Sequence, residues 1–206
     1  DLNKYNMKTG DILLFDCEDY NFFGWFSFLI KYFTRSKFSH IGMVIKDPIY
    51  INSNMKGYYL WHSDWTNYPD PQDGKKKFGI QFTPLNVMIH NYQKNNGKIF
   101  LRRIHYEKNV FTTENIKKIH HIVYEKPYDT NIKDWINALI RKDNQPQKLN
   151  RFWCSAFVGY IYTFCSILTS DTDWSILRPS DFSTEYNNYL HFNNGFYLDP
   201  LQIEIL

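Results

Sequence analysis

The chain of 206 residues has a composition typical of a folded, soluble domain. Aromatic residues form 19% and charged residues 22% of it, which supplies large apolar groups for a core and excludes a disordered chain. The net charge of +3 is small and the lysines are scattered, so a nucleic-acid-binding surface is not expected. At this length the whole chain, residues 1–206, fits a single domain.

The three cysteines, Cys17, Cys154 and Cys165, lack the dense spacing of a disulfide-rich secreted scaffold. An odd number leaves at least one free thiol, and we expect an intracellular, cytoplasmic protein. The longest apolar stretch, residues 154–168, contains polar side chains and is too short to cross a bilayer. The abundance of Asn, Lys, Ile and Tyr is typical of AT-rich genomes, including those of some large DNA viruses. A viral protein of this kind would be a candidate for association with the virion.

Apolar runs next to turn residues predict three strands in the first third of the chain, at residues 12–15, 39–45 and 58–64. Between the first two, apolar residues at helical spacing predict an amphipathic helix over residues 22–33. In the second strand, His40 shares a face with Gly42 and Val44. In the third strand, His62 shares a face with Asp64.

The remaining elements follow the same patterns. Residues 69–77 predict an exposed loop whose three lysines form a solvated cluster without a catalytic role. The pattern after the loop favours strands at 78–82 and 98–104, helices at 84–92, 113–124 and 132–141, and a main helix whose apolar stripe runs from Cys154 to Leu168. Asn150 is the expected N-cap of the main helix, and Ser180 or Asp181 is expected to cap a short helix at the turn over residues 178–181.

Cys154 is the candidate nucleophile. Near the first turn of its helix, the unpaired amide groups and the helix dipole favour an anion, and the amide of Cys154 itself suits an oxyanion hole. The alternative is that Cys154 is simply the first buried member of the apolar stripe.

His40 is the candidate base, because a thiol nucleophile needs an imidazole to take its proton. A third group must hold that imidazole in the right tautomer. Antiparallel pairing of the strands that carry His40 and His62 would place either His62 or Asp64 beside His40. The sequence does not fix the register, so either residue can be the orienting group.

The other candidate residues point to no cofactor and no metal site. His120 and His121 are adjacent on a helix and point in different directions, and no cysteine pair has zinc spacing. Cys17 and Cys165 are expected to fill core space. The histidines outside these groups, His90, His105 and His191, have no partner pattern.

Four motifs occur in a recognisable order: residues 10–15 (GDILLF), 39–45 (SHIGMVI), 127–129 (PYD) and 153–158 (WCSAFV). Together they resemble the NlpC-like, circularly permuted papain-fold cysteine hydrolases, especially the YiiX-like branch and its poxvirus relatives. Histidine before cysteine is the permuted order. Residues 101–103 (LRR) and 178–181 (RPSD) are also similar to that family, so the resemblance spans nearly the whole chain.

The resemblance implies an α+β papain-like fold in which the helix carrying Cys154 packs on an antiparallel sheet carrying His40. The third polar residue of the YiiX-like branch, often a glutamate, corresponds to His62, with Asp64 as the alternative. A second histidine in this role is similar to the lecithin:retinol acyltransferase-like relatives, although their Asn-Cys-Glu-His signature is absent around Cys154. Tyr128 resembles a family tyrosine near the active site, which makes it a candidate to assist the oxyanion; its alternative role is packing in a turn.

These observations predict a papain-like thiol hydrolase that cleaves an amide or peptide bond in a peptide-like or acyl substrate. His40 would deprotonate Cys154, the thiolate would attack the carbonyl, and water would release the acyl-enzyme. One alternative is a lipid acyltransferase or phospholipase-like enzyme with the same chemistry, which alone would require contact with a membrane. The other is a non-catalytic binding module on the same fold. The sequence carries no information on the oligomeric state.

Overall fold

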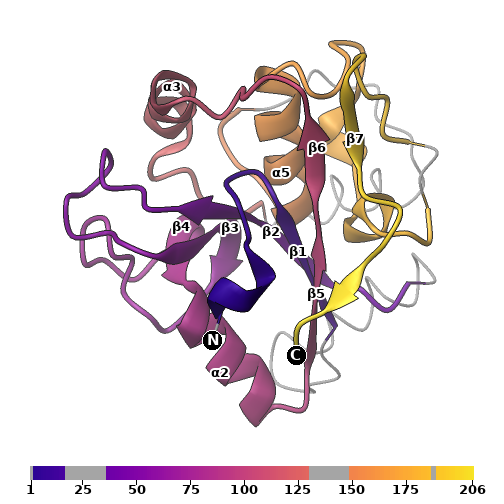
Figure 1. The fold of residues 1–206 in the computed structure, drawn as a ribbon. Helices are drawn as coiled ribbons and strands as arrows, with labels where there is room; N and C mark the ends of the chain where they lie inside the picture. The colour runs from indigo at the N-terminus through magenta and orange to yellow at the C-terminus, as the bar shows by residue number, and fades with distance from the viewer. Residues whose placement is uncertain (1, 17–35, 130–148, 187–188) are drawn as a thin grey trace.

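The computed structural model describes residues 2–16, 36–129, 149–186 and 189–206. These residues form an α+β fold built on an antiparallel sheet, with three α-helices among the described elements (Figure 1). The helices predicted at 22–33 and 132–141, together with Cys17, lie outside the described residues.

Six strands form the main sheet in the order β4-β3-β2-β1-β5-β8, and each neighbouring pair is antiparallel. A second sheet pairs β6 with β7. The strands are β1 (Ile12–Asp16), β2 (His40–Lys46), β3 (Tyr58–Trp65), β4 (Phe78–Pro84), β5 (Lys98–Arg102), β6 (Ile104–Tyr106), β7 (Phe196–Leu198) and β8 (Ile203–Glu204). The first three predicted strands and the one at 78–82 are confirmed.

The strand predicted at 98–104 is instead divided at Arg103, between β5 and β6. The backbone N–H of Ile104 donates to the buried carboxylate of Asp11 at 3.1 Å. The side chain of Arg102 donates to the carbonyl oxygens of Phe182 and Ser183, in the segment after the main helix. These long-range contacts turn the chain from one sheet into the other, which no local pattern in the sequence indicates.

The helices are α2 (Leu85–Lys94), α3 (Thr113–Val123) and α5 (Cys154–Phe164), with 3₁₀ turns η1 (Leu2–Tyr5), η2 (Trp174–Ile176) and η3 (Pro179–Phe182). The helices predicted at 84–92 and 113–124 are confirmed. Asn150 does not cap α5, because the helix begins at Cys154 and its N-cap is Trp153. At η3 the N-cap is Arg178, whose N–H donates to the Asp181 carboxylate inside the turn.

Helix α5 is shorter than its apolar stripe predicts. Cys165 is the C-cap, and Ser166 adopts a left-handed conformation with φ of 56°. The N–H groups of Ser166 and Ile167 then donate to carbonyl groups of the last turn, which ends the helix in the manner of a Schellman motif. Cys165 is buried, as expected, and Leu168 lies beyond the helix.

The sheet separates two apolar cores. In β1, Ile12 and Leu14 belong to the core that contains α5, whereas Leu13 and Phe15 belong to the core that contains the buried side of α2. This is the alternation that a strand covered on both faces must show. Figure 1 shows β1 and β2 between α2 and α5.

The three lysines of the 69–77 segment differ from the expected solvated cluster. Lys75 is exposed and pairs with Glu125 at 2.7 Å. Lys77 has only 10% of its side chain exposed, and its ammonium group lies 2.9 Å from the buried Asp70 and 2.6 Å from Asp73. The prediction is therefore wrong for Lys77, because the turn folds back and buries Asp70 with it.

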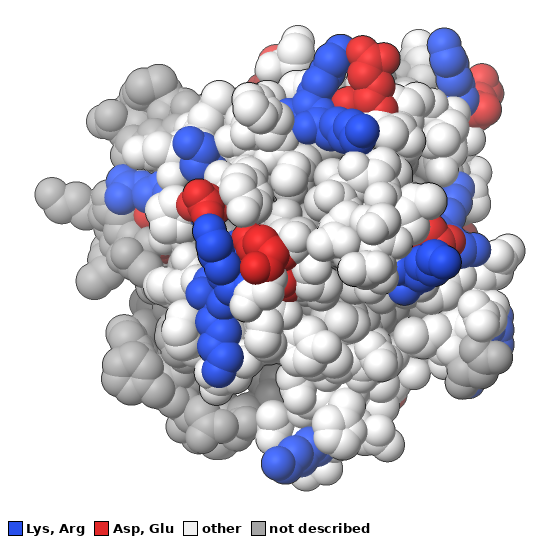
Figure 2. Space-filling view, turned by 90° about the vertical axis from the view of Figure 1, so that its left-hand side faces the viewer, with Lys and Arg blue, Asp and Glu red and all other residues white. Residues whose placement is uncertain are grey.

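The face of the molecule in Figure 2 carries Lys and Arg side chains next to Asp and Glu side chains. Opposite charges also form ion pairs on the surface, as in Lys98–Glu204 and Lys118–Glu114. Such exposed pairs contribute little to stability individually.

No helix within the described parts of the chain has both the length and the apolar character that a membrane span requires.

His120 on α3 gives the fold a testable pH dependence. Its ring packs on Trp61 and Phe82, and burial, followed by the charge of Lys77, lowers its pKa to about 4. Unfolded histidine binds a proton near pH ~6.5, so the unfolded state gains protons first and stability is lost as the pH falls from that value toward 4. We expect His120→Gln to remove about 1–3 kcal/mol of this loss.

The measurement is urea denaturation at pH 7.5 and pH 4, with His121→Gln, an exposed neighbour on α3, as the matched control. Equal acid sensitivity in the wild type and in His120→Gln would show that the partly buried ring does not resist protonation.

Candidate functional site

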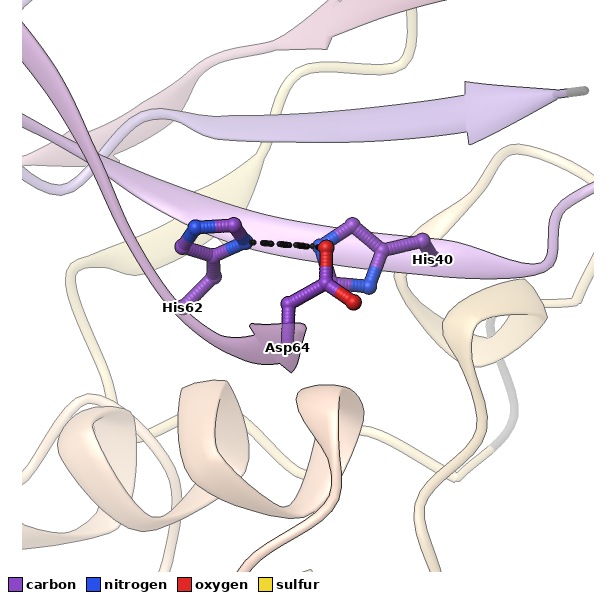
Figure 3. Close-up of side chains that lie close together, drawn as sticks. All are labelled: His40, His62 and Asp64. Carbon is purple, nitrogen blue, oxygen red and sulfur yellow. Dashed lines mark hydrogen bonds and ion pairs between the residues drawn. The ribbon is translucent and has the colours of Figure 1, made fainter. Parts of the chain in front are cut away.

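Three polar side chains meet where β2 begins and β3 ends. The two strands are antiparallel with Met43 opposite Trp61, and this register continued along the strands places His40 opposite Asp64 and Gly42 opposite His62. Figure 3 shows the two imidazole rings side by side, with the carboxylate of Asp64 next to them. The prediction that antiparallel pairing brings these side chains to His40 is confirmed.

Both candidate orienting groups reach the same atom of His40. Nε2 of His40 lies 2.9 Å from Nδ1 of His62, a hydrogen-bond distance. The Oδ2 atom of Asp64 lies 3.6 Å from His40 Nε2 and 3.7 Å from His62 Nδ1. His62 therefore makes the hydrogen bond, and Asp64 adds a negative charge beside it.

The neighbouring strands fix the position of His62. Its Nε2 atom lies 3.0 Å from the hydroxyl of Thr83 on β4, and both side chains are fully buried. On the other side is Gly42, where a Cβ atom would lie 2.6 Å from Leu60 Cγ and 3.0 Å from His62 Cβ. A side chain at position 42 would clash with Leu60 and crowd the Cβ atom of His62, so glycine leaves room for both residues.

Burial controls the charge of this cluster. It lowers the pKa of His40, an effect that the nearby carboxylate of Asp64 opposes. It lowers the pKa of His62 still further, and His40 adds to that effect. Burial also raises the pKa of Asp64, against the influence of His40. Both imidazoles are therefore neutral near pH 7, and each has one nitrogen that can accept a proton.

Cys154 lies at the first position of α5, on the other face of the sheet from His40. The His40 ring packs against Phe15, with ring centroids 5.3 Å apart, and Phe15 belongs to the core around α2. Cys154 belongs instead to the core around α5. The ladder between β2 and β3 ends at Met43 and Trp61. Beyond it, the backbone N–H of Ile41 forms a hydrogen bond with the Cys154 thiol. The sulfur thus lies close to the backbone of the residue that follows His40 on β2.

The environment of Cys154 favours the neutral thiol. Burial, with a smaller contribution from the charge of Asp64, raises its pKa to about 12. The amides of Ile41, Ser155 and Cys154 lower the pKa but do not outweigh burial. The amides at the start of the helix favour a thiolate, as expected, but desolvation of the buried sulfur is the larger effect.

His40 has one nitrogen left for chemistry. Within the described residues, the Nδ1 atom of His40 has no hydrogen-bond partner, and no hydrogen bond joins the His40 ring to Cys154. Because Nε2 is held by His62, Nδ1 is the nitrogen through which His40 can exchange a proton.

Tyr128 lies close enough to Cys154 and Asp64 for their charges to act on it. Burial raises the pKa of Tyr128 well above its usual value, and the charges of Cys154 and Asp64 act in the same direction. Its ring stacks on Phe78 at 5.1 Å, and its N–H donates to the Phe78 carbonyl. Tyr128 is thus both a packing residue of its turn and a protonated hydroxyl beside the candidate nucleophile.

The remaining candidates lie elsewhere. Cys165 is buried at the end of α5, and its pKa is raised by burial to about 12. His105 lies 2.9 Å from the carboxylate of Asp199 next to the small sheet. Sequence reasoning about metals concentrated on His120 and His121. Among the described residues, the three donors close enough to hold an ion are instead His40, His62 and Asp64.

Sequence reasoning also missed Thr83 and Gly42. Thr83 lies on β4, opposite Leu60 rather than opposite His62, so its contact with His62 is diagonal across the strand pair. Only the register of β3 with β4 indicates that Thr83 contacts His62. Gly42 belongs to a recognised motif, but its role depends on the residues opposite it on β3.

A search of protein-family models gave no match. The chain is 26% identical over 223 residues to an uncharacterized protein of Acanthamoeba polyphaga mimivirus, an alignment that covers 96% of this chain and 84% of that protein.

Replacing Thr83 tests the hydrogen-bond chain. Thr83→Val keeps the shape of the side chain but leaves Nε2 of His62 buried without its partner. We expect it to lower the free energy of unfolding by about 1–3 kcal/mol. Urea denaturation at pH 7.5 measures this, and Thr83→Ser, which keeps the hydroxyl, is the control that should recover most of the loss. A Val variant as stable as the wild type would show that the contact contributes nothing.

Proposed function

We propose that the chain is a cysteine hydrolase with a permuted papain-like fold, which cleaves an amide or peptide bond by covalent catalysis at Cys154. The observation that carries the proposal is the hydrogen bond between His40 Nε2 and His62 Nδ1, with Asp64 beside it. A base held through one nitrogen has a defined tautomer and orientation, which is the role of the third member of a catalytic triad.

The arrangement of elements supports the fold part of the proposal. Helix α5 packs on the antiparallel sheet that carries His40, with Cys154 at its first position. The base precedes the nucleophile in the chain, as in the permuted order. The motif resemblance described above fits a relative of the viral members of this superfamily.

In the proposed reaction the thiol and the imidazole are both neutral at the start. His40 Nδ1 takes the proton of Cys154 as the sulfur forms a bond with the substrate carbonyl carbon. The imidazolium that results is stabilised by Asp64 and by the hydrogen bond to His62. His40 then gives the proton to the leaving amine, and the carbonyl carbon remains bonded to sulfur as a thioester.

Water completes the cycle. His40, neutral again, takes a proton from the water molecule that attacks the thioester, and returns it to the sulfur as the acid leaves. The oxyanion of each tetrahedral intermediate would accept hydrogen bonds from the amide of Cys154 and the hydroxyl of Tyr128. Such donors typically contribute 10²–10³-fold to the rate in enzymes of this type, which is about 2.7–4 kcal/mol.

The tautomers in this scheme are determined by the hydrogen-bond chain. For Nδ1 of His40 to accept a proton, Nε2 must carry one and donate it to Nδ1 of His62. His62 then carries its own proton on Nε2 and donates it to the Thr83 hydroxyl. The chain from His40 to Thr83 thus keeps the base in the form that catalysis requires.

A second candidate function is acyl transfer or hydrolysis on a lipid. It is favoured by one observation: the group bonded to His40 is an imidazole, as in the acyltransferase-like relatives, rather than a carboxylate or amide. The covalent chemistry would be the same, but the acyl donor would be a phospholipid at a membrane surface. A non-catalytic binding module is the remaining alternative.

The proposal predicts a thioester on Cys154. Purified protein would be incubated with p-nitrophenyl esters of blocked amino acids and of fatty acids, quenched in acid and examined by peptide mass spectrometry. We expect an acyl adduct on Cys154 that is absent in Cys154→Ser and forms about 10²–10⁴-fold more slowly in His40→Asn. Cys165→Ser, which removes the other described buried thiol, is the matched control and should react normally.

The acyl group identifies the function. Adducts from amino-acid esters, formed without liposomes, support the peptide or amide hydrolase. Adducts from fatty acyl esters that need liposomes would support the lipid enzyme instead. If no ester acylates Cys154 in the folded protein, the binding-module interpretation takes first place.

A further inference from the structure

We propose that His40, His62 and Asp64 form a binding site for a divalent transition-metal cation of the zinc type, and that a cation bound there inhibits the thiol chemistry. The first part rests on the geometry of the cluster alone. The second part, inhibition, rests on the proposed function of Cys154 and His40.

The donor atoms have the spacing that such a cation requires. The three pairwise separations are 2.9 Å between His40 Nε2 and His62 Nδ1, and 3.6 and 3.7 Å from these atoms to Oδ2 of Asp64. Zinc bonds of about 2.0–2.2 Å in a tetrahedral geometry place ligand atoms roughly 3.3–3.5 Å apart. The observed separations lie on both sides of this range, so shifts of a few tenths of an ångström would complete the site.

The surroundings of the cluster also suit a metal. Metal-bound histidine usually donates its second ring N–H to a polar neighbour, and Nε2 of His62 has such a neighbour in the Thr83 hydroxyl. Two imidazoles and one carboxylate are a common ligand set for zinc in sites that keep a fourth position open. His40 and His62 are buried, whereas the Asp64 side chain is 33% exposed and gives the ion a way in.

Metal binding and base catalysis exclude one another at His40. A cation on Nε2 leaves the ring proton on Nδ1, the nitrogen that must accept the thiol proton in the proposed reaction. The cation also replaces the hydrogen bond from His40 to His62. Bound metal would therefore inactivate the enzyme without any bond to Cys154, and a chelator would restore activity.

The binding experiment uses the metal-free full chain titrated with Co²⁺ and followed by absorption, with Zn²⁺ competition to obtain the affinity. We expect one equivalent of Co²⁺ with visible d–d bands and no sulfur-to-cobalt charge-transfer band. Asp64→Asn and His62→Gln should weaken Zn²⁺ binding by more than the roughly 10–100-fold that the loss of an outer-shell partner costs. Thr83→Val, which removes such a partner, should fall within that range.

His105→Gln is the matched control. His105 also lies beside a carboxylate, that of Asp199 at 2.9 Å, but this pair belongs to no three-donor group among the described residues. Its substitution should leave the affinity unchanged. Circular dichroism and thermal melting identify folded variants, and Asp64→Asn, at the most exposed of the three ligands, keeps the test available if His62→Gln fails to fold.

The site proposal is overturned if the wild type binds no stoichiometric Co²⁺, or if folded Asp64→Asn and His62→Gln bind as tightly as the wild type. A thiolate charge-transfer band that disappears in Cys154→Ser would also overturn it, because the ligand set would then be different. Thioester formation measured with Zn²⁺ and with chelator tests inhibition. Unchanged or faster acylation with Zn²⁺ overturns inhibition, whereas a lack of acylation in both samples contradicts the proposed function and leaves the titration result standing.

Discussion

The hydrogen bond between His40 and His62 depends on the antiparallel pairing of β2 with β3, and the orientation of the candidate base depends on that bond. The register of the two strands places His40, His62 and Asp64 on one face within reach of one another. Gly42 leaves room for Leu60 and the Cβ atom of His62, and Thr83 forms a hydrogen bond with Nε2 of His62. A slip of one residue would send these side chains to opposite faces and abolish the cluster.

The second constraint is the burial of Cys154. Three backbone N–H groups stabilise a negative charge on its sulfur, yet burial holds the pKa of the thiol at about 12. In the proposed reaction the thiol and the imidazoles start neutral, so proton transfer to His40 would accompany attack on the substrate carbonyl rather than precede it. This arrangement protects the sulfur from unspecific oxidation, because the thiolate is the reactive form.

Local patterns in the sequence were sufficient for β1 to β4, α2 and α3, because each has a clear apolar period and a turn at its end. They also indicated that His62 or Asp64 lies beside His40, which the structure confirms, whereas the role of Cys154 as nucleophile stays a prediction. Local patterns were not sufficient where contacts between residues far apart in the sequence determine the structure. Examples are the break between β5 and β6, the burial of Lys77 with Asp70, and the contact of Thr83 with His62. The sequence left His62 and Asp64 as alternatives, and the structure places both beside His40.

The most direct test of this account is the protonation state of the two imidazoles, measured by ¹⁵N NMR of the folded protein at pH 7. We expect both rings to be neutral, with the proton of His40 on Nε2 and that of His62 on Nε2, as the chain from His40 to Thr83 requires. The substitutions His40→Asn and His62→Gln assign the resonances. A proton on Nδ1 of His40, or a charged ring at this pH, would contradict the proposed role of His40 as the base for Cys154.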